Sequence, residues 1–259
     1  MSARAEDIRA AVGSSGESGA SPAGIVAGPV LRTCLPIMAV ILVLALAGRW
    51  YQQWAAWEHG LDATTPAFET YWMTLFYVES VVIWSASLIT WAWLWLTRDR
   101  NLDRLQPNEE FRRYMVWVGI IAAYVFALYF AASYFAEEDA SWHQTVLRDT
   151  SFTPSHIILF YGSFPLYILL GGSMLIYAMT RLPVYAHRMS VTVLVAVVGP
   201  FLIMPNVAYN EWGHAFWSSE EIFALPLHWG FVVFGWAALA FGGLLVQVMN
   251  RLVVLLPKV

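Results

Sequence analysis

Two short stretches of the sequence place side chains that can bind a metal in the same order. In the first stretch, Asp139 and His143 lie four residues apart, and His156 follows a proline near the start of an apolar segment. Side chains four residues apart share one face of a helix, and proline is common in the first turn of a helix. One carboxylate and two imidazoles on such a frame would form a three-ligand site with open positions, which suits oxygen-activating or hydrolytic metals.

The second stretch repeats the arrangement with an amide in place of the carboxylate. Asn210 and His214 lie four residues apart, and His228 again follows a proline near the start of an apolar segment. The offset from the first group is nearly constant at all three positions, which indicates two equivalent helix pairs. Because asparagine is a neutral and weaker ligand, we expect the second site to hold its metal less tightly. For each group, a network of polar caps at helix ends is the competing interpretation.

A few other side chains stand out by type. Glu79 lies about two turns inside an apolar segment, and an acid within a membrane is costly and therefore a functional candidate. The competing interpretation is a structural role, with Glu79 held by neighbouring Ser80 and facing polar groups. His59 and His187 stand alone in loops and are interpreted as surface residues. The single Cys34 excludes a disulfide framework and a multi-cysteine zinc site.

The composition predicts a membrane protein. Hydrophobic residues make up 59% of the chain and charged residues only 12%, against about 25% charged residues in soluble domains. A transmembrane helix needs about 20 mostly apolar residues. Six segments meet or nearly meet this requirement: 31–50, 70–96, 114–136, 155–179, 190–208 and 227–250. We therefore predict an all-α polytopic membrane protein, a bundle of about six transmembrane helices. The net charge of −4 gives no reason to expect a nucleic-acid partner.

The basic residues predict the orientation of this bundle. All of the 14 lysines and arginines except Arg49 and Arg148 fall in the termini or in the loops on one side of the six segments. Basic residues accumulate on the cytoplasmic side of membrane proteins. Both termini are therefore expected in the cytoplasm, and both ligand groups on the periplasmic side.

The N-terminal part of the chain differs from the rest. Residues 4–12 are expected to form a short surface helix, and the Gly, Ser, Ala and Pro residues that follow have too little apolar surface to pack. We therefore divide the chain into an N-terminal surface helix and linker, 1–29, and a transmembrane domain, 30–259, that carries both ligand groups. The order of basic, apolar and cleavage regions typical of a signal peptide is missing, so the first span is expected to be retained.

Several runs of the sequence, most of them around the candidate ligands, are similar to the C subunit of particulate methane monooxygenase. These runs are 137–144 (EEDASWHQ), 148–156 (RDTSFTPSH), 161–165 (YGSFP), 179–183 (MTRLP), 210–217 (NEWGHAFW) and 226–231 (PLHWGF). The resemblance covers essentially everything after the N-terminal linker. The same superfamily includes ammonia and short-chain hydrocarbon monooxygenases.

The resemblance implies a copper enzyme of the bacterial inner, intracytoplasmic membrane. Its subunits A, B and C would form a trimer of heterotrimers that oxidises methane to methanol with O2 and a reductant, which we take to be quinol. All six candidate ligands match metal-site positions of the C subunit, three in each of two sites. Copper also heads the affinity order for nitrogen ligands.

Further interpretations stay open at this stage. The chain could belong to an ammonia or short-chain alkane monooxygenase, or be a scaffold subunit whose metal sites are structural. A b-type haem quinone oxidoreductase is another possibility, but haem ligands usually face each other from the middle of helices. A metal transporter would need polar residues along the whole width of the membrane, and the segments offer few.

Overall fold

The computed structural model describes residues 22–134, 153–199, 235–236 and 238–256. Every regular element in these ranges is helical. Along the chain they are α2 (Pro22–His59), α3 (Pro66–Phe68), η1 (Glu69–Met73), α4 (Thr74–Leu96), η2 (Leu102–Arg104), α5 (Pro107–Leu128), η3 (Tyr129–Tyr134), α7 (Pro154–His156), η4 (Ile157–Ser163), α8 (Phe164–Arg181), α9 (Pro183–His187), α10 (Val191–Val198) and α13 (Gly242–Leu255). The segments η1, η3 and η4 are π-helical, and η2 is a 3₁₀ turn.

Five stretches of the described chain are helical, long and apolar enough to cross a membrane: Ala27–His59, Pro66–Leu96, Pro107–Leu128, Pro154–Arg181 and Ala238–Leu255. The prediction of an all-α, multi-pass membrane protein is therefore confirmed. Of the predicted segment 190–208, the structure describes only the part that contains α10. The predicted surface helix at 4–12 lies outside the described residues.

The first helix is longer than predicted at both ends. It begins at Pro22, inside the stretch expected to be a linker, and it continues past residue 50 to His59. Gly60 stops it, because its backbone has a φ of 77°, a left-handed conformation that favours glycine. The next helix begins at Pro66, where the Thr65 side chain accepts a hydrogen bond from the backbone N–H of Phe68 at 3.4 Å.

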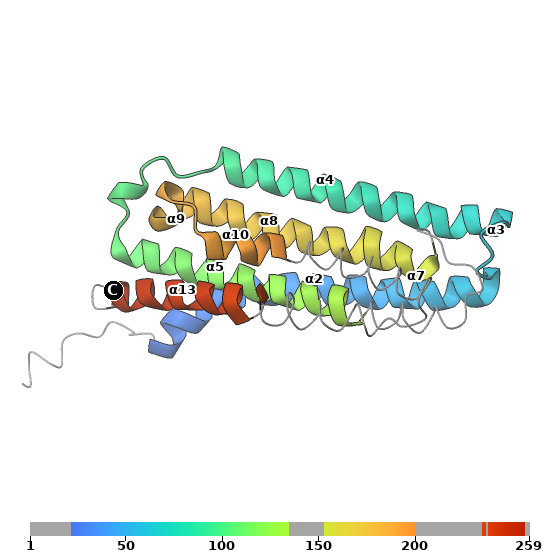
Figure 1. The fold of residues 1–259 in the computed structure, drawn as a ribbon, viewed down its shortest axis with the longest axis horizontal. Coiled ribbons are helices and arrows are strands. Elements are labelled where there is room, and N and C mark those ends of the chain that lie inside the picture. The colour runs from blue at the N-terminus through green and yellow to red at the C-terminus, as the bar shows by residue number, and fades with distance from the viewer. Residues whose placement is uncertain (1–21, 135–152, 200–234, 237, 257–259) are drawn as a thin grey trace, which may run out of the picture.

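The long helices pack around α8 and α5. Helix α8 lies between α4 and α5, while α2 and α13 pack against α5 (Figure 1). The helices α2 and α5 approach closely at Gly119, where an added Cβ would lie 2.8 Å from the carbonyl oxygen of Val30. Small residues allow such close backbone approach between membrane helices.

Aromatic side chains tie the helices together with hydrogen bonds. Trp91 of α4 and Trp117 of α5 donate to backbone carbonyls of α8 at 3.2 and 2.9 Å, and Tyr124 of α5 donates to a carbonyl of α10 at 3.0 Å. Buried indole N–H and phenol O–H groups need such partners. These bonds fix the relative positions of α4, α5, α8 and α10.

Large apolar side chains stand exposed on α2 and α4, among them Val43, Trp57, Val81, Ile89 and Leu96. In a protein that crosses a membrane, such faces contact lipid or neighbouring subunits.

Candidate functional site

His156 is the candidate ligand that the structure describes. It lies in the short helix α7, which begins at Pro154, as the sequence predicts. Its side chain is buried, with only 5% of the residue exposed. The imidazole ring lies 4.8 Å from the ring of Phe160, between ring centroids. The chain therefore holds this imidazole in the interior of the protein, at the beginning of a membrane-spanning helix.

The helix widens immediately after His156. Residues Ile157–Ser163 form the π-helical segment η4 before the α-helix resumes as α8. A second π-helical segment, η3, ends α5 at Tyr134, shortly before the stretch that contains Asp139 and His143. Short π-helical segments inside helices are frequent at functional sites. The predicted first ligand group is thus flanked by two departures from regular helix geometry.

The other five predicted ligands lie outside the described residues. These are Asp139, His143, Asn210, His214 and His228. Among the described residues, no three His, Cys, Asp or Glu side chains come close enough together to hold a metal. The grouping of the six ligands into two sites therefore stays a prediction.

The two histidines interpreted as isolated surface residues both have neighbours. His59 is half-buried and its ring stacks on Tyr71, with centroids 3.5 Å apart. His187 is exposed but its Nε2 lies 2.9 Å from a carboxylate oxygen of Asp103. The interpretation that both stand alone in loops was wrong, because His59 ends α2 and His187 ends α9. Tyr71 and Asp103 belong to other elements, η1 and η2, so the packing that brings them close has no signal at the histidines themselves.

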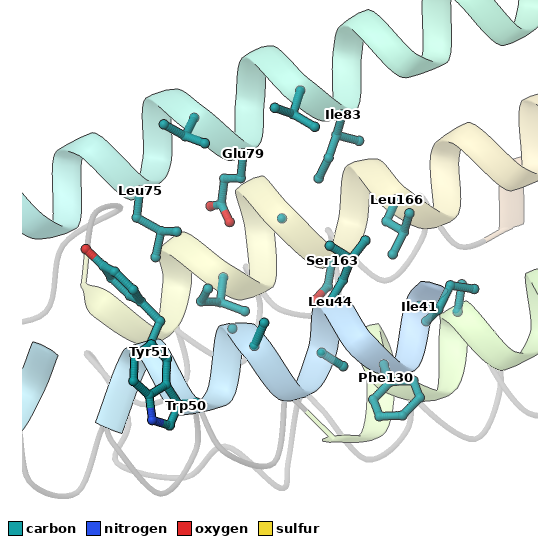
Figure 2. Close-up of a pocket in the computed structure, with 18 residues that line it drawn as sticks. Ile41, Leu44, Trp50, Tyr51, Leu75, Glu79, Ile83, Phe130, Ser163 and Leu166 are labelled. Carbon is teal, nitrogen blue, oxygen red and sulfur yellow. The ribbon is translucent and has the colours of Figure 1, made fainter. Parts of the chain in front are cut away.

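An apolar cavity of about 400 Å³ lies between the long helices (Figure 2). Ile158, Gly162 and Ser163 of η4 line it, so it begins two residues after His156 in the same helix. Helices α2, α4 and α8 and the segments α5 and η3 complete the wall, with Leu44, Tyr51, Val78, Phe130 and Leu166 among the lining residues. The wall is almost entirely hydrocarbon and aromatic.

Glu79 is the exception in this wall. Its side chain reaches from α4 toward η4 (Figure 2). Among the lining residues, Glu79 is the one acidic or basic side chain. Its Oε1 atom is buried and has no hydrogen-bond partner among the described residues. Gly162 leaves room for the carboxyl group, since a Cβ there would lie 2.6 Å from Oε2. The interpretation that facing polar groups hold Glu79 in a structural role is therefore not supported, because no such group among the described residues bonds to Oε1.

Sequence reasoning singled out Glu79 because of its type, but it missed the cavity and the role of Gly162. The available signal for Gly162 was its place in the run 161–165, one of those that carry the resemblance to the methane monooxygenase subunit.

A comparison with protein families now gives these features a context. Residues 30–259 match the family of the C subunits of ammonia monooxygenase and methane monooxygenase. The chain belongs to this family. No curated protein matches the chain. As a member of this family, it is one part of a multi-subunit membrane monooxygenase, and partner subunits accompany it.

The opposite end of this monooxygenase subunit is rich in ion pairs. We call this end, formed by residues 97–113, 180–190 and Arg251, the arginine-rich end. The other end, which contains η1, η3, α7 and η4, we call the His156 end. Arg251 makes two hydrogen bonds of 2.7 Å to the carboxylate of Glu110. Arg113 contacts both Asp99 and Glu109 at 2.9 Å. These contacts join the ends of α4, α5 and α13.

Proposed function

We propose that this chain is the C subunit of a copper-dependent monooxygenase that oxidises methane to methanol with O2 and quinol. It would act in a trimer of heterotrimers with subunits A and B. The observation that carries the proposal is the burial of His156, a predicted ligand, at the start of a membrane-spanning helix in a chain of this family. A buried imidazole is stabilised when its nitrogens bind polar partners, and a metal is such a partner.

The donor set fits copper. Each proposed site combines two imidazoles with one oxygen donor, a carboxylate from Asp139 in the first site and an amide from Asn210 in the second. Nitrogen-rich sites of this kind bind copper more tightly than other divalent first-row metals. Copper bound there would supply the activation of O2.

The described residues around His156 would keep the site dry. Ile157, Ile158 and Leu159 are buried beside it, and Phe160 packs against the imidazole ring. Exclusion of water strengthens electrostatic interactions and prevents side reactions of activated intermediates.

These apolar surroundings favour methane over ammonia as the substrate. Methane has no polar group and moves favourably from water into an apolar environment, whereas ammonia would lose its hydrogen bonds with water there. Membranes that contain the assembled complex should consume O2 with methane, more slowly with ethane, and least with ammonia. O2 consumption with ammonia but not with methane would overturn the choice of substrate and leave the family assignment intact.

The second candidate function is that of an ammonia or short-chain alkane monooxygenase subunit, and the third is a scaffold whose metal sites are structural. The family description names both ammonia and methane, which favours the ammonia enzyme over the alkane enzyme and the scaffold. A scaffold would keep full turnover after its ligands are replaced.

The proposed orientation places both termini in the cytoplasm and the His156 end in the periplasm of a bacterial inner membrane. It rests on the distribution of basic residues. Single cysteines introduced at Gln144 and Ser218 should react with an impermeant thiol reagent in intact spheroplasts, whereas a cysteine at Asn101 should not. Reaction at Asn101 alone would reverse the orientation.

A further inference from the structure

The cavity beside Glu79 is far larger than the gases that the enzyme handles. Its volume is about 400 Å³. Methane, O2 and ammonia are each about the size of a water molecule, whose share of liquid volume is about 30 Å³. Pockets for small organic molecules measure about 300–1,000 Å³. The cavity therefore fits a molecule with a ring or a chain better than it fits a gas.

The cavity is accessible from the side of the helix bundle. Leu44 on α2 and Val78 and Val82 on α4 line it and are also exposed on the outer surface of these helices. That surface is apolar and belongs to two membrane-spanning helices. A ligand that enters between α2 and α4 must therefore be soluble in the membrane.

Within the described residues that line the cavity, Glu79 provides the one carboxyl group that such a ligand would meet. Its Oε1 atom is buried without a hydrogen-bond partner in the described part of the chain, and a buried polar atom without a partner is destabilising. The hydroxyl group of Tyr51, also at the cavity, already donates to the carbonyl oxygen of Tyr71 at 2.8 Å. A ligand with a hydrogen-bond donor would therefore satisfy Oε1 of Glu79.

This requirement separates the possible occupants. The acyl chain of a lipid would fill the apolar volume but would leave Glu79 unpaired. A molecule with an apolar ring and a hydroxyl group satisfies both parts of the site. Rings of Trp50, Tyr51 and Phe130 are among the lining residues and offer contacts for an aromatic ligand.

We propose that this cavity binds a lipid-soluble aromatic hydroxyl compound of the hydroquinone type, whose hydroxyl group donates a hydrogen bond to Oε1 of Glu79. The proposal deepens the proposed function in one respect, since the quinol named there as reductant would be such a ligand. His156, the predicted metal ligand that lies within the described residues, is not among the residues that line the cavity. Binding can therefore be measured separately from metal content and turnover.

The test is photolabelling of the assembled complex in membranes with an azido-hydroquinone. Labels should map to residues 41–51, 75–83, 127–130 and 158–166. Unlabelled hydroquinone should displace the probe at about tenfold lower concentration than its dimethyl ether, which keeps the ring but has no donor. About tenfold is the effect of one hydrogen bond to a buried acceptor.

Three variants on the same helical stretch test whether Glu79 causes the tenfold preference and whether the ligand lies in the cavity. Glu79→Leu should bind both compounds equally, because the acceptor is gone and the apolar wall remains. Glu69→Leu is the matched control: Glu69 is exposed and lies outside the cavity wall, so the tenfold preference should persist. Val78→Trp should weaken the binding of both compounds, because the larger side chain fills the cavity from its exposed side and leaves the buried core unchanged.

Three results would overturn the proposal: equal displacement by both compounds in the natural protein, a preference that survives in Glu79→Leu, or labels only outside the four segments. The first would indicate a purely apolar occupant such as a lipid chain. The outcome is distinguishable from a failure of the proposed function, because His156→Ala should lose copper and turnover yet keep the labelling.

Discussion

The two ends of the helix bundle differ in the pairing of their buried carboxyl groups. At the arginine-rich end, Arg251, Glu110, Arg113 and Asp99 are engaged in ion pairs and hydrogen bonds of 2.7–2.9 Å. At the His156 end, the buried Oε1 atom of Glu79 has no hydrogen-bond partner in the described part of the chain. The two ends lie at opposite extremes of the long axis of the molecule (Figure 1).

The helices also differ between the two ends. The π-helical segments η1, η3 and η4 belong to the His156 end, and further π-helical residues, 235–236 and 238–241, precede α13. Helices α5 and α8 are regular where they approach the arginine-rich end. Regular helices with paired charges stabilise a fold. Irregular helices and unsatisfied polar atoms are destabilising, and natural proteins concentrate such departures at functional sites. We therefore propose that the arginine-rich end stabilises the fold and that the His156 end carries the chemistry.

The largest expected effect tests this division with one histidine from each end. His156→Ala should lower copper content and reduce methane-dependent turnover of the assembled complex by more than about 100-fold, because even residues that only support a metal ligand change affinity by about 10–100-fold. His187→Ala removes the exposed contact with Asp103 and should leave turnover within about twofold. Copper analysis and O2 consumption measure both. Equal and small effects of the two variants would remove the distinction between the ends.

The next effect concerns the two predicted ligand groups, which we propose to lie on the same side of the membrane. Asp139→Ala removes an anionic ligand and should lower copper affinity of the first site by about 10–100-fold, whereas Asn210→Ala removes a neutral amide and should cost less than about tenfold. Alanine at His143, His214 or His228 should lower copper affinity more than Asn210→Ala does. Titration of copper into the metal-depleted complex gives the order. A larger loss from Asn210→Ala would reverse the ranking of the sites.

At the arginine-rich end the expected effect is on stability. Glu110 is only 4% exposed, and Glu110→Gln leaves the guanidinium of Arg251 without its anionic partner. Breaking a fully buried pair costs about 3–5 kcal/mol, and because Arg251 is about a third exposed we expect about 2–3 kcal/mol. Thermal unfolding of the complex should shift to lower temperature with little change in turnover. The control Glu109→Gln, in a more exposed ion-pair group, should cost less than about 1 kcal/mol.

The same contrast explains which features the sequence revealed. Apolar runs are a local signal, and they predicted the spans 70–96, 114–136 and 155–179, which overlap the helices that begin at Pro66, Pro107 and Pro154. Of these three prolines, the sequence analysis used only Pro154. The buried position of His156 after Pro154 follows from the same kind of signal. Glu79 also stood out, because an acid in an apolar run is conspicuous by type alone.

Features that depend on packing between distant helices escaped prediction. The pairing of His187 with Asp103 joins residues 84 positions apart. The cavity requires side chains from α2, α4, α8, η3 and η4 together, and Gly162 matters only because the carboxyl group of Glu79 lies against it. The continuation of α2 past residue 50 was missed because its last turns contain the polar residues Gln52, Gln53, Glu58 and His59 and so fall outside a search for apolar runs.

The smallest expected effect is a pH dependence that again differs between the ends. The backbone N–H of Asn101, followed by the guanidinium of Arg113, lowers the pKa of Asp99 below its ordinary value of 3.8. A lowered pKa in the folded state means that the contribution to stability is complete at neutral pH. It declines as the pH falls through 3.8 toward the folded-state pKa.

Asp99→Asn should therefore lower the free energy of unfolding by at most about 1 kcal/mol at pH 7, and this deficit should shrink below pH 3.8. Asp62, at the His156 end, has its pKa lowered by the backbone N–H and side-chain hydroxyl of Thr64 alone. It has no ion pair among the described residues and it is exposed, so Asp62→Asn should change the pH profile less. Thermal unfolding of both variants between pH 3 and pH 7 measures the difference. A larger effect at Asp62 would mean that the arginine-rich end does not owe its stability to paired charges.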